Sequence, residues 1–76
     1  MVVSMTDLTV GDCARVVAYV SGTEFVQRLM SLGLVPGTVI CLRRIAPLGD
    51  PVEIEFRGFR LALRSLEAAC LSLEPL

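Results

Sequence analysis

The sequence predicts a mainly β fold: a small SH3-like barrel of about five antiparallel strands, with one inserted α-helix and a short helical turn. Five short segments of strand-forming residues follow one another within 76 residues. One segment with helical periodicity separates the first strand from the rest. A chain of this size forms one domain, so we expect residues 1–76 to fold as a single SH3-like unit. Closure into a barrel would protect the edges of such short strands.

The first strand is expected over Cys13–Val20, where β-branched and aromatic residues dominate. A helix of about ten residues should follow, because Ser21–Glu24 matches a capping box. Its apolar stripe consists of Phe25, Leu29 and Leu32. Gly33 stands where a helix usually ends in the left-handed conformation.

The next part of the chain carries strong turn signals. Val35–Thr38 has the Pro-Gly pair of a type II turn, and a second strand is expected over Thr38–Ile45. Ala46–Pro51 is then a loop, in which two X-Pro steps favour extended backbone at the residue before each proline.

A β-hairpin is expected where apolar and charged residues alternate. Val52–Phe56 and Phe59–Arg64 pair through a two-residue loop, Arg57–Gly58. This register directs Phe56 and Phe59 inward and sets Glu55 opposite Arg60 on the wet face. Two shorter elements complete the prediction: a helical turn over Ser65–Ala69 and a last strand over Cys70–Leu73.

The composition excludes most enzyme classes. The chain has no histidine, lysine or tryptophan, so the commonest general base and the lysine amine nucleophile are missing. Glu53 and Glu55 share a strand face and could act as an acid–base pair, but a solvated face is the simpler interpretation. Five arginines lie between residues 33 and 64, yet the net charge of −1 and the scarcity of aromatic residues argue against nucleic-acid binding.

The three cysteines, Cys13, Cys41 and Cys70, are odd in number and lack C-x-x-C spacing. We expect neither a disulfide framework nor a zinc site, but buried, inert thiols in a reducing compartment. Convergence of all three on a soft metal is the alternative. The longest uninterrupted apolar run, Val16–Val20, is too short to span a membrane. The high mean hydropathy, +0.71, therefore favours a protein partner.

Three segments of the sequence resemble the FeoA family, ferrous iron transport protein A of bacteria. They are Arg28–Gly37, Arg44–Val52 with its Ala-Pro-Leu-Gly-Asp-Pro stretch, and Phe59–Arg64 followed by Glu67-Ala68. The resemblance covers roughly residues 5 to 75. It implies an SH3-like fold and no enzymatic activity. It also implies a cytoplasmic accessory role at the inner membrane, through docking on ferrous iron transport protein B, a transporter with a GTP-binding domain. The residues themselves, without histidine and without clustered cysteines, give no reason to expect a cofactor.

The expected docking surface is the loop Leu48, Gly49, Asp50 and Pro51, with Met30 and Leu34 as neighbours. Leu48 would be the apolar anchor, Gly49 would supply the backbone geometry and Asp50 the polar register. No metal site and no catalytic site are expected. A homodimer is possible in this scheme. A nucleic-acid-binding or metal-responsive regulatory module is the alternative function.

Overall fold

The computed structural model describes residues 1–20 and 23–76. The helical elements are a 3₁₀ turn, η1 (Met5–Asp7), the helix α1 (Thr23–Ser31) and the short α2 (Ser65–Ala68). The strands are β1 (Cys13–Tyr19), β2 (Val39–Ile45), β3 (Val52–Phe56), β4 (Phe59–Leu63) and β5 (Leu71–Pro75). The predicted mainly β architecture is confirmed, and η1 is an element that the sequence pattern did not predict. The predicted capping box at Ser21–Glu24 lies partly outside the described residues.

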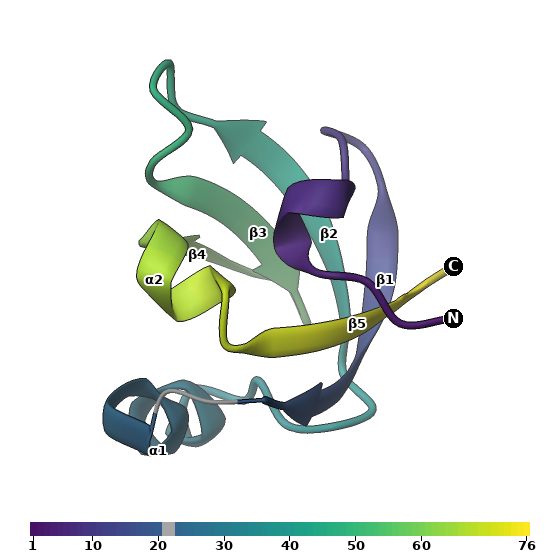
Figure 1. Ribbon diagram of the computed structural model, residues 1–76, viewed down its shortest axis with the longest axis vertical. Coiled ribbons are helices and arrows are strands. Elements are labelled where there is room, and N and C mark those ends of the chain that lie inside the picture. The colour runs from purple at the N-terminus through teal and green to yellow at the C-terminus, as the bar shows by residue number, and fades with distance from the viewer. Residues whose placement is uncertain (21–22) are drawn as a thin grey trace.

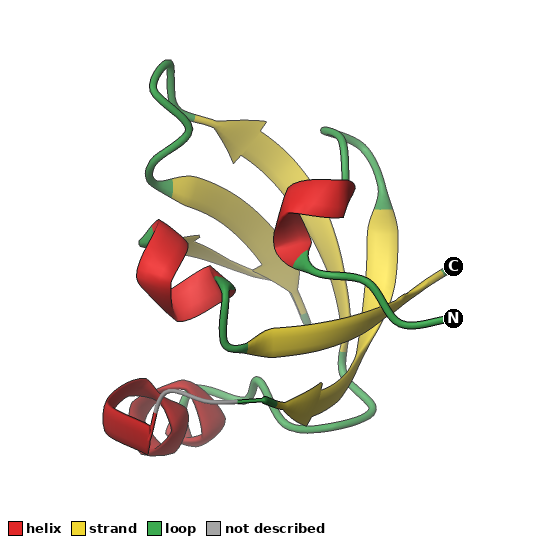
Figure 2. Ribbon diagram, viewed as in Figure 1, coloured by secondary structure: helices red, strands yellow, loops and turns green. Residues whose placement is uncertain are grey.

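The five strands form one antiparallel sheet in the order β4-β3-β2-β1-β5. The sheet is strongly bent, and η1 and α2 lie on its concave side (Figures 1 and 2). The helix α1 lies at one end of the molecule, and the loop Ala46–Pro51 between β2 and β3 projects at the opposite end (Figure 1). The core fills the space between the sheet and these helical elements.

The β3–β4 hairpin has the predicted register. Phe56 lies opposite Phe59, and Glu55 lies opposite Arg60. The two loop residues take positive φ values, 50° at Arg57 and 82° at Gly58, as a type I′ hairpin turn requires. Arg57 therefore occupies a conformation that glycine or asparagine would adopt more readily.

The expectation that Phe59 faces inward is wrong. Phe56 is 4% exposed, whereas Phe59 is 66% exposed. The two rings remain near each other, with centroids 6.5 Å apart. Phe59 begins β4, which lies at the edge of the sheet with β3 as its neighbour in the strand order.

The end of α1 follows the predicted glycine cap. The Gly33 amide donates to the Met30 carbonyl oxygen at 3.0 Å, and the Leu34 amide donates to the Leu29 carbonyl oxygen at 3.1 Å. Gly33 has φ of 108°. These bonds define a Schellman motif, in which Leu34 packs toward Leu29. Both leucines are fully buried.

The expectation of three inert thiols is wrong for two of them. Cys13 and Cys41 are joined by a disulfide, with their Cα atoms 4.0 Å apart. The two residues lie directly opposite each other in the β1–β2 register. Cys70 is a buried free thiol, as predicted, but lies in the turn before β5. The Cys13–Cys41 pairing depends on a register that no short hairpin turn sets, because α1 interrupts the connection.

Candidate functional site

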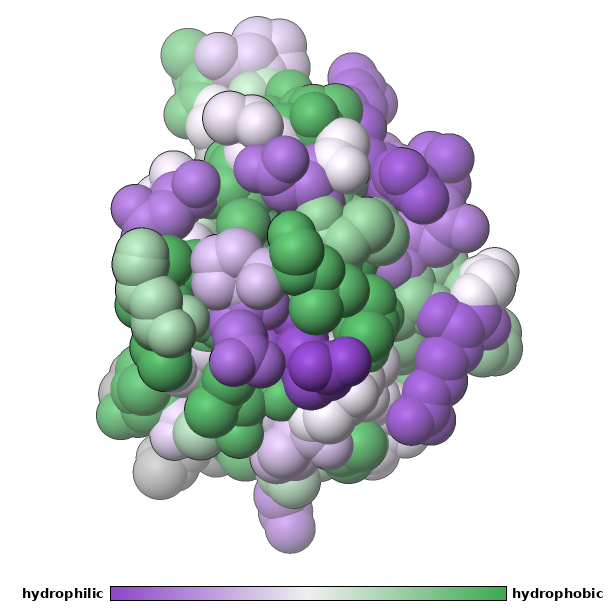
Figure 3. All heavy atoms as spheres, turned by 90° about the vertical axis from the view of Figure 1, so that its right-hand side faces the viewer, coloured by the Kyte–Doolittle hydropathy of each residue, from purple (hydrophilic) through white to green (hydrophobic). Residues whose placement is uncertain are grey.

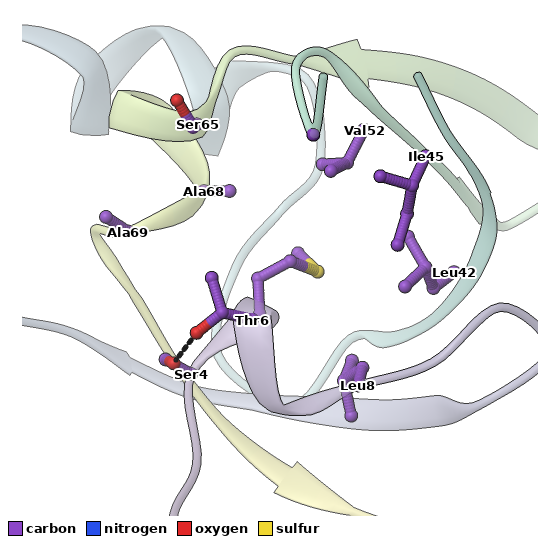
Figure 4. A pocket seen from close by; sticks show the side chains of 11 residues that line it. Ser4, Thr6, Leu8, Leu42, Ile45, Val52, Ser65, Ala68 and Ala69 are labelled. Carbon is purple, nitrogen blue, oxygen red and sulfur yellow. Dashed lines mark hydrogen bonds between the residues drawn. The ribbon is translucent and has the colours of Figure 1, made fainter. Parts of the chain in front are cut away.

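An apolar groove with a volume of about 290 Å³ opens between η1, α2 and the β2–β3 end of the sheet. Its side chains converge on a common space in Figure 4. The lining residues are Ser4, Met5, Thr6, Leu8, Leu42, Ile45, Gly49, Val52, Ser65, Ala68 and Ala69. All of them are uncharged, so the groove is suited to hold an apolar group and offers no acid–base chemistry.

The first wall of the groove is η1, which the rest of the fold holds in place. Met5 and Leu8 are almost fully buried and anchor the turn to the core. Its start is capped by Asp7, whose Oδ2 accepts from the Ser4 amide at 3.0 Å. Two backbone hydrogen bonds between Val3 and Leu73, 2.7 and 2.9 Å long, tie the preceding residues to β5.

The second wall belongs to the loop Ala46–Pro51. The Ala46 amide donates to the Pro51 carbonyl oxygen at 3.0 Å, and the Gly49 amide donates to the Ala46 carbonyl oxygen at 2.8 Å. Asp50 Oδ1 accepts from the Ser65 amide at 2.7 Å. Asp50 therefore fastens the loop to the first residue of α2. The polar contact expected for Asp50 from the sequence is with a docking partner; this hydrogen bond gives Asp50 a structural role within the fold.

Leu48 projects from this fastened loop with 96% of its surface exposed. Its neighbour Gly49 lines the groove, so an exposed leucine and an apolar cavity lie at the same end of the molecule. Ile45, also in the wall, is 41% exposed. Together they form an apolar projection beside an apolar recess, a combination suited to a protein partner.

The structure does not bring Met30 and Leu34 to this surface. Met30 is 38% exposed on α1, at the end of the molecule opposite the loop (Figure 1). Leu34 is fully buried, because the Schellman motif turns it inward. The expected neighbourhood of these two residues with Leu48 is therefore wrong.

The acidic residues of β3 lie in a network of ion pairs on the outer face of the sheet. Glu53 pairs with two arginines: its Oε2 lies 3.7 Å from Arg44 Nη1, and its Oε1 lies 3.6 Å from Arg60 Nη1. Glu55 lies 2.8 Å from Arg43. Three of the arginines considered for nucleic-acid binding therefore face carboxylates. The arrangement is that of a solvated, charge-balanced strand face.

A less exposed ion pair joins the two helices and was not predicted. Arg28 Nη2 of α1 donates to Glu67 Oε2 of α2. Glu67 is 5% exposed, and its Oε1 accepts from the Arg64 amide at 2.9 Å. The carboxylate thus caps α2 and links it to α1 through the Arg28 side chain.

Tyr19 gives a second polar link near α1. Its hydroxyl donates to the Leu34 carbonyl oxygen at 2.6 Å. Burial, with a smaller contribution from the nearby Cys70 thiol, raises the pKa of Tyr19 above its usual value.

Other surfaces and sites are less distinctive. On the face that carries both termini, small apolar areas are separated by polar and charged side chains (Figure 3). Within residues 1–20 and 23–76, no three His, Cys, Asp or Glu side chains lie together as a metal site. In the same part of the chain, no helix has the length and apolarity to cross a membrane.

Comparisons with known proteins identify the family and the fold of the chain. Residues 3–75 match the FeoA domain family, whose members are non-enzymatic accessory proteins. The FeoA protein of Chlorobium tepidum is 36% identical and superposes with a TM-score of 0.89, over 97% of this chain and 70% of that one. The FeoA of Stenotrophomonas maltophilia, a prokaryotic SH3 domain protein solved in complex with zinc, is 25% identical with a TM-score of 0.78, over 95% of this chain and 89% of that one.

A curated relative is an Fe(2+) transport protein A/Fe(2+) transporter FeoB fusion protein of Porphyromonas gingivalis. It is 31% identical over 92% of this chain, and the chain spans 8% of that protein's length. The match over residues 3–75 and the shared SH3-like fold confirm the resemblance found in the sequence: the chain belongs to the FeoA family of accessory proteins of ferrous iron transport.

Proposed function

We propose that this chain supports or regulates ferrous iron uptake by docking on FeoB through Leu48 and the apolar groove. The observation that carries the proposal is the fusion protein, in which a segment similar to this chain and the FeoB transporter form one polypeptide. A covalent link raises the effective concentration of two modules, and is useful when they act on each other. We place this contact at the cytoplasmic side of the membrane.

The geometry supports docking by insertion of apolar side chains. Leu48 is almost fully exposed and belongs to a loop fixed by three hydrogen bonds, so little further ordering of the loop is needed on binding. The neighbouring groove can accept an apolar side chain of the partner. Burial of one leucine side chain contributes about 1.5–3 kcal/mol, which corresponds to roughly 10- to 150-fold in the dissociation constant.

The test is a binding measurement with full-length FeoB in detergent. Leu48→Asp should weaken binding by at least about tenfold, because it removes the apolar anchor and adds a charge that must be desolvated. Leu76→Asp is the matched control, since Leu76 is a 67% exposed leucine of the C-terminus. Both variants should keep the thermal stability of the parent, because neither side chain is buried.

A second variant addresses the groove itself. Ala69 lines the groove and is exposed, so Ala69→Leu should fill part of the recess without disturbing the core. It should also weaken binding to FeoB. Equal affinities of the parent, the Leu48→Asp variant and the Ala69→Leu variant would show that this end of the molecule is not the docking surface.

A further inference from the structure

The Cys13–Cys41 disulfide lies at the junction between two parts of the sheet. β2, β3 and β4 form one continuous antiparallel meander, while β5 pairs with β1 on the other side. The β1–β2 ladder that joins them has three register pairs, fewer than the five of β1–β5 or of β3–β4. The disulfide is therefore a covalent addition to the shortest of these ladders.

The junction also lies behind the apolar groove. Leu42, next to Cys41, lines the groove from β2, and the η1 wall leads through residues 8–12 into Cys13. Two backbone hydrogen bonds cross here, from the Gly11 amide to the Leu42 carbonyl oxygen and from the Leu42 amide to the Asp12 carbonyl oxygen, each 2.8 Å long. The disulfide thus connects the chain segments that carry the two walls.

Solutes can reach this pair more readily than the third cysteine. Cys13 and Cys41 are partly exposed, whereas Ala14 and Leu42, which follow them along their strands, are fully buried. Because side chains alternate along a strand, both sulfur atoms lie on the outer face. Cys70 is 3% exposed, and its Sγ donates to the Leu66 carbonyl oxygen at 3.3 Å inside the fold.

We propose that Cys13 and Cys41 are a reversible oxidation site, a dithiol–disulfide pair that exchanges with low-molecular-weight disulfides such as glutathione disulfide. The inference stands independently of docking on FeoB. Their Cα atoms are 4.0 Å apart in a fixed strand register, so the two thiols are held together without a conformational search. Accessible pairs of this kind exchange by thiolate attack, whereas buried thiols do not.

The chemistry balances in two exchange steps. The thiolate of one cysteine, after losing its proton, attacks a sulfur of glutathione disulfide, forms a mixed disulfide and expels one glutathione thiolate. The second cysteine, also deprotonated, attacks the protein-bound sulfur of that mixed disulfide and expels the other glutathione thiolate. Each released thiolate takes up one proton. The protein dithiol is oxidised by two electrons, and one glutathione disulfide becomes two glutathione molecules.

The test follows thiol content by mass spectrometry. The full chain is incubated in buffers of graded glutathione to glutathione disulfide ratio, then quenched with an alkylating agent under native conditions. Because Cys70 is buried, only Cys13 and Cys41 should react with the alkylating agent. The number of adducts per chain should fall from two to none as the buffer becomes oxidising, and return to two when a reductant is added. The Cys70→Ser variant should behave identically. Cys41→Ser should instead stop at one mixed disulfide with glutathione, on Cys13.

Two results would overturn the proposal. The first is a chain that still gives two adducts after incubation in excess glutathione disulfide, which would show that Cys13 and Cys41 form no disulfide. The second is a disulfide that resists reduction until the protein is denatured, which would make it a permanent crosslink. Hydrogen exchange gives an independent readout: the Gly11 and Leu42 amides should exchange more slowly in the oxidised form than in the Cys13→Ser/Cys41→Ser variant.

Discussion

Loss of the Cys13–Cys41 bond should cost a large part of the stability of this small domain. The bond closes a loop between residues 28 positions apart. The loop-entropy relation gives about 12 cal/mol/K for this length, or about 3.6 kcal/mol at 25 °C. An unfolding entropy of about 2.1 cal/mol/K per residue, applied to 76 residues, converts this into a fall of about 22 °C in Tm.

Far-UV circular dichroism in urea measures this difference, and is a suitable probe because the chain has no tryptophan. Unfolding curves are compared for the oxidised chain, the chain with a phosphine reductant and the Cys13→Ser/Cys41→Ser variant. The last two should coincide, and both should lie below the oxidised form in free energy of unfolding. A difference below about 1 kcal/mol would refute the reasoning, because loop closure of this length cannot contribute so little unless native-state strain cancels it.

Three further predictions concern single side chains. Glu67→Ala should lower the free energy of unfolding by about 2–3 kcal/mol, since it removes both the cap of α2 and the acceptor for Arg28; chemical denaturation measures it, and Glu67→Gln should recover part of the loss. Arg57→Gly should raise Tm and increase the free energy of unfolding by about 1 kcal/mol, because glycine takes the positive φ of the hairpin turn without strain. An unchanged or lower Tm would contradict this. Stability should fall as the pH rises above the unfolded tyrosine pKa of about 10, because the folded chain holds the proton of Tyr19 more tightly than the unfolded chain does; Tyr19→Phe should remove this dependence, measured by denaturation between pH 8 and about 11.

Local signals predicted much of the fold. The β3–β4 register followed from the sequence because a single pairing places apolar residues together on one face and Glu55 opposite Arg60 on the other. The type II turn at Val35–Thr38 followed from its Pro-Gly pair, and the structure has the Thr38 amide bonded to the Val35 carbonyl oxygen at 3.1 Å. In each case, neighbouring residues alone determine the geometry.

Features that depend on distant pairing could not be predicted in the same way. The Cys13–Cys41 bond depends on the β1–β2 register, which is set across α1 and not by a turn. The η1 turn has three residues, too few for a periodic pattern. Arg28 and Glu67 lie 39 residues apart, so their pairing exists only once the fold brings these two side chains together.

In the candidate site, too, some features follow from neighbouring residues and others depend on distant parts of the chain. Exposure of Leu48 followed from the proline-bracketed loop, and the structure agrees. The groove beside it is built from η1, β2, β3 and α2, which no local pattern brings together. The burial of Leu34 follows from the Schellman motif at Gly33, whose hydrophobic contact is a known accompaniment of such caps. That signal was present in the sequence and could have excluded Leu34 from the docking surface.

The most direct test of the proposed docking surface is an NMR titration of the chain, methyl-labelled at leucine and isoleucine, with full-length FeoB in lipid nanodiscs. The proposal predicts that the methyl signals of Leu48 and Ile45 shift or broaden first, and that those of Leu32 near the end of α1 stay unchanged. It also predicts that Leu48→Asp abolishes the effect at equal concentrations. Perturbation confined to Leu32 and its surroundings, or none at saturating FeoB, would contradict it.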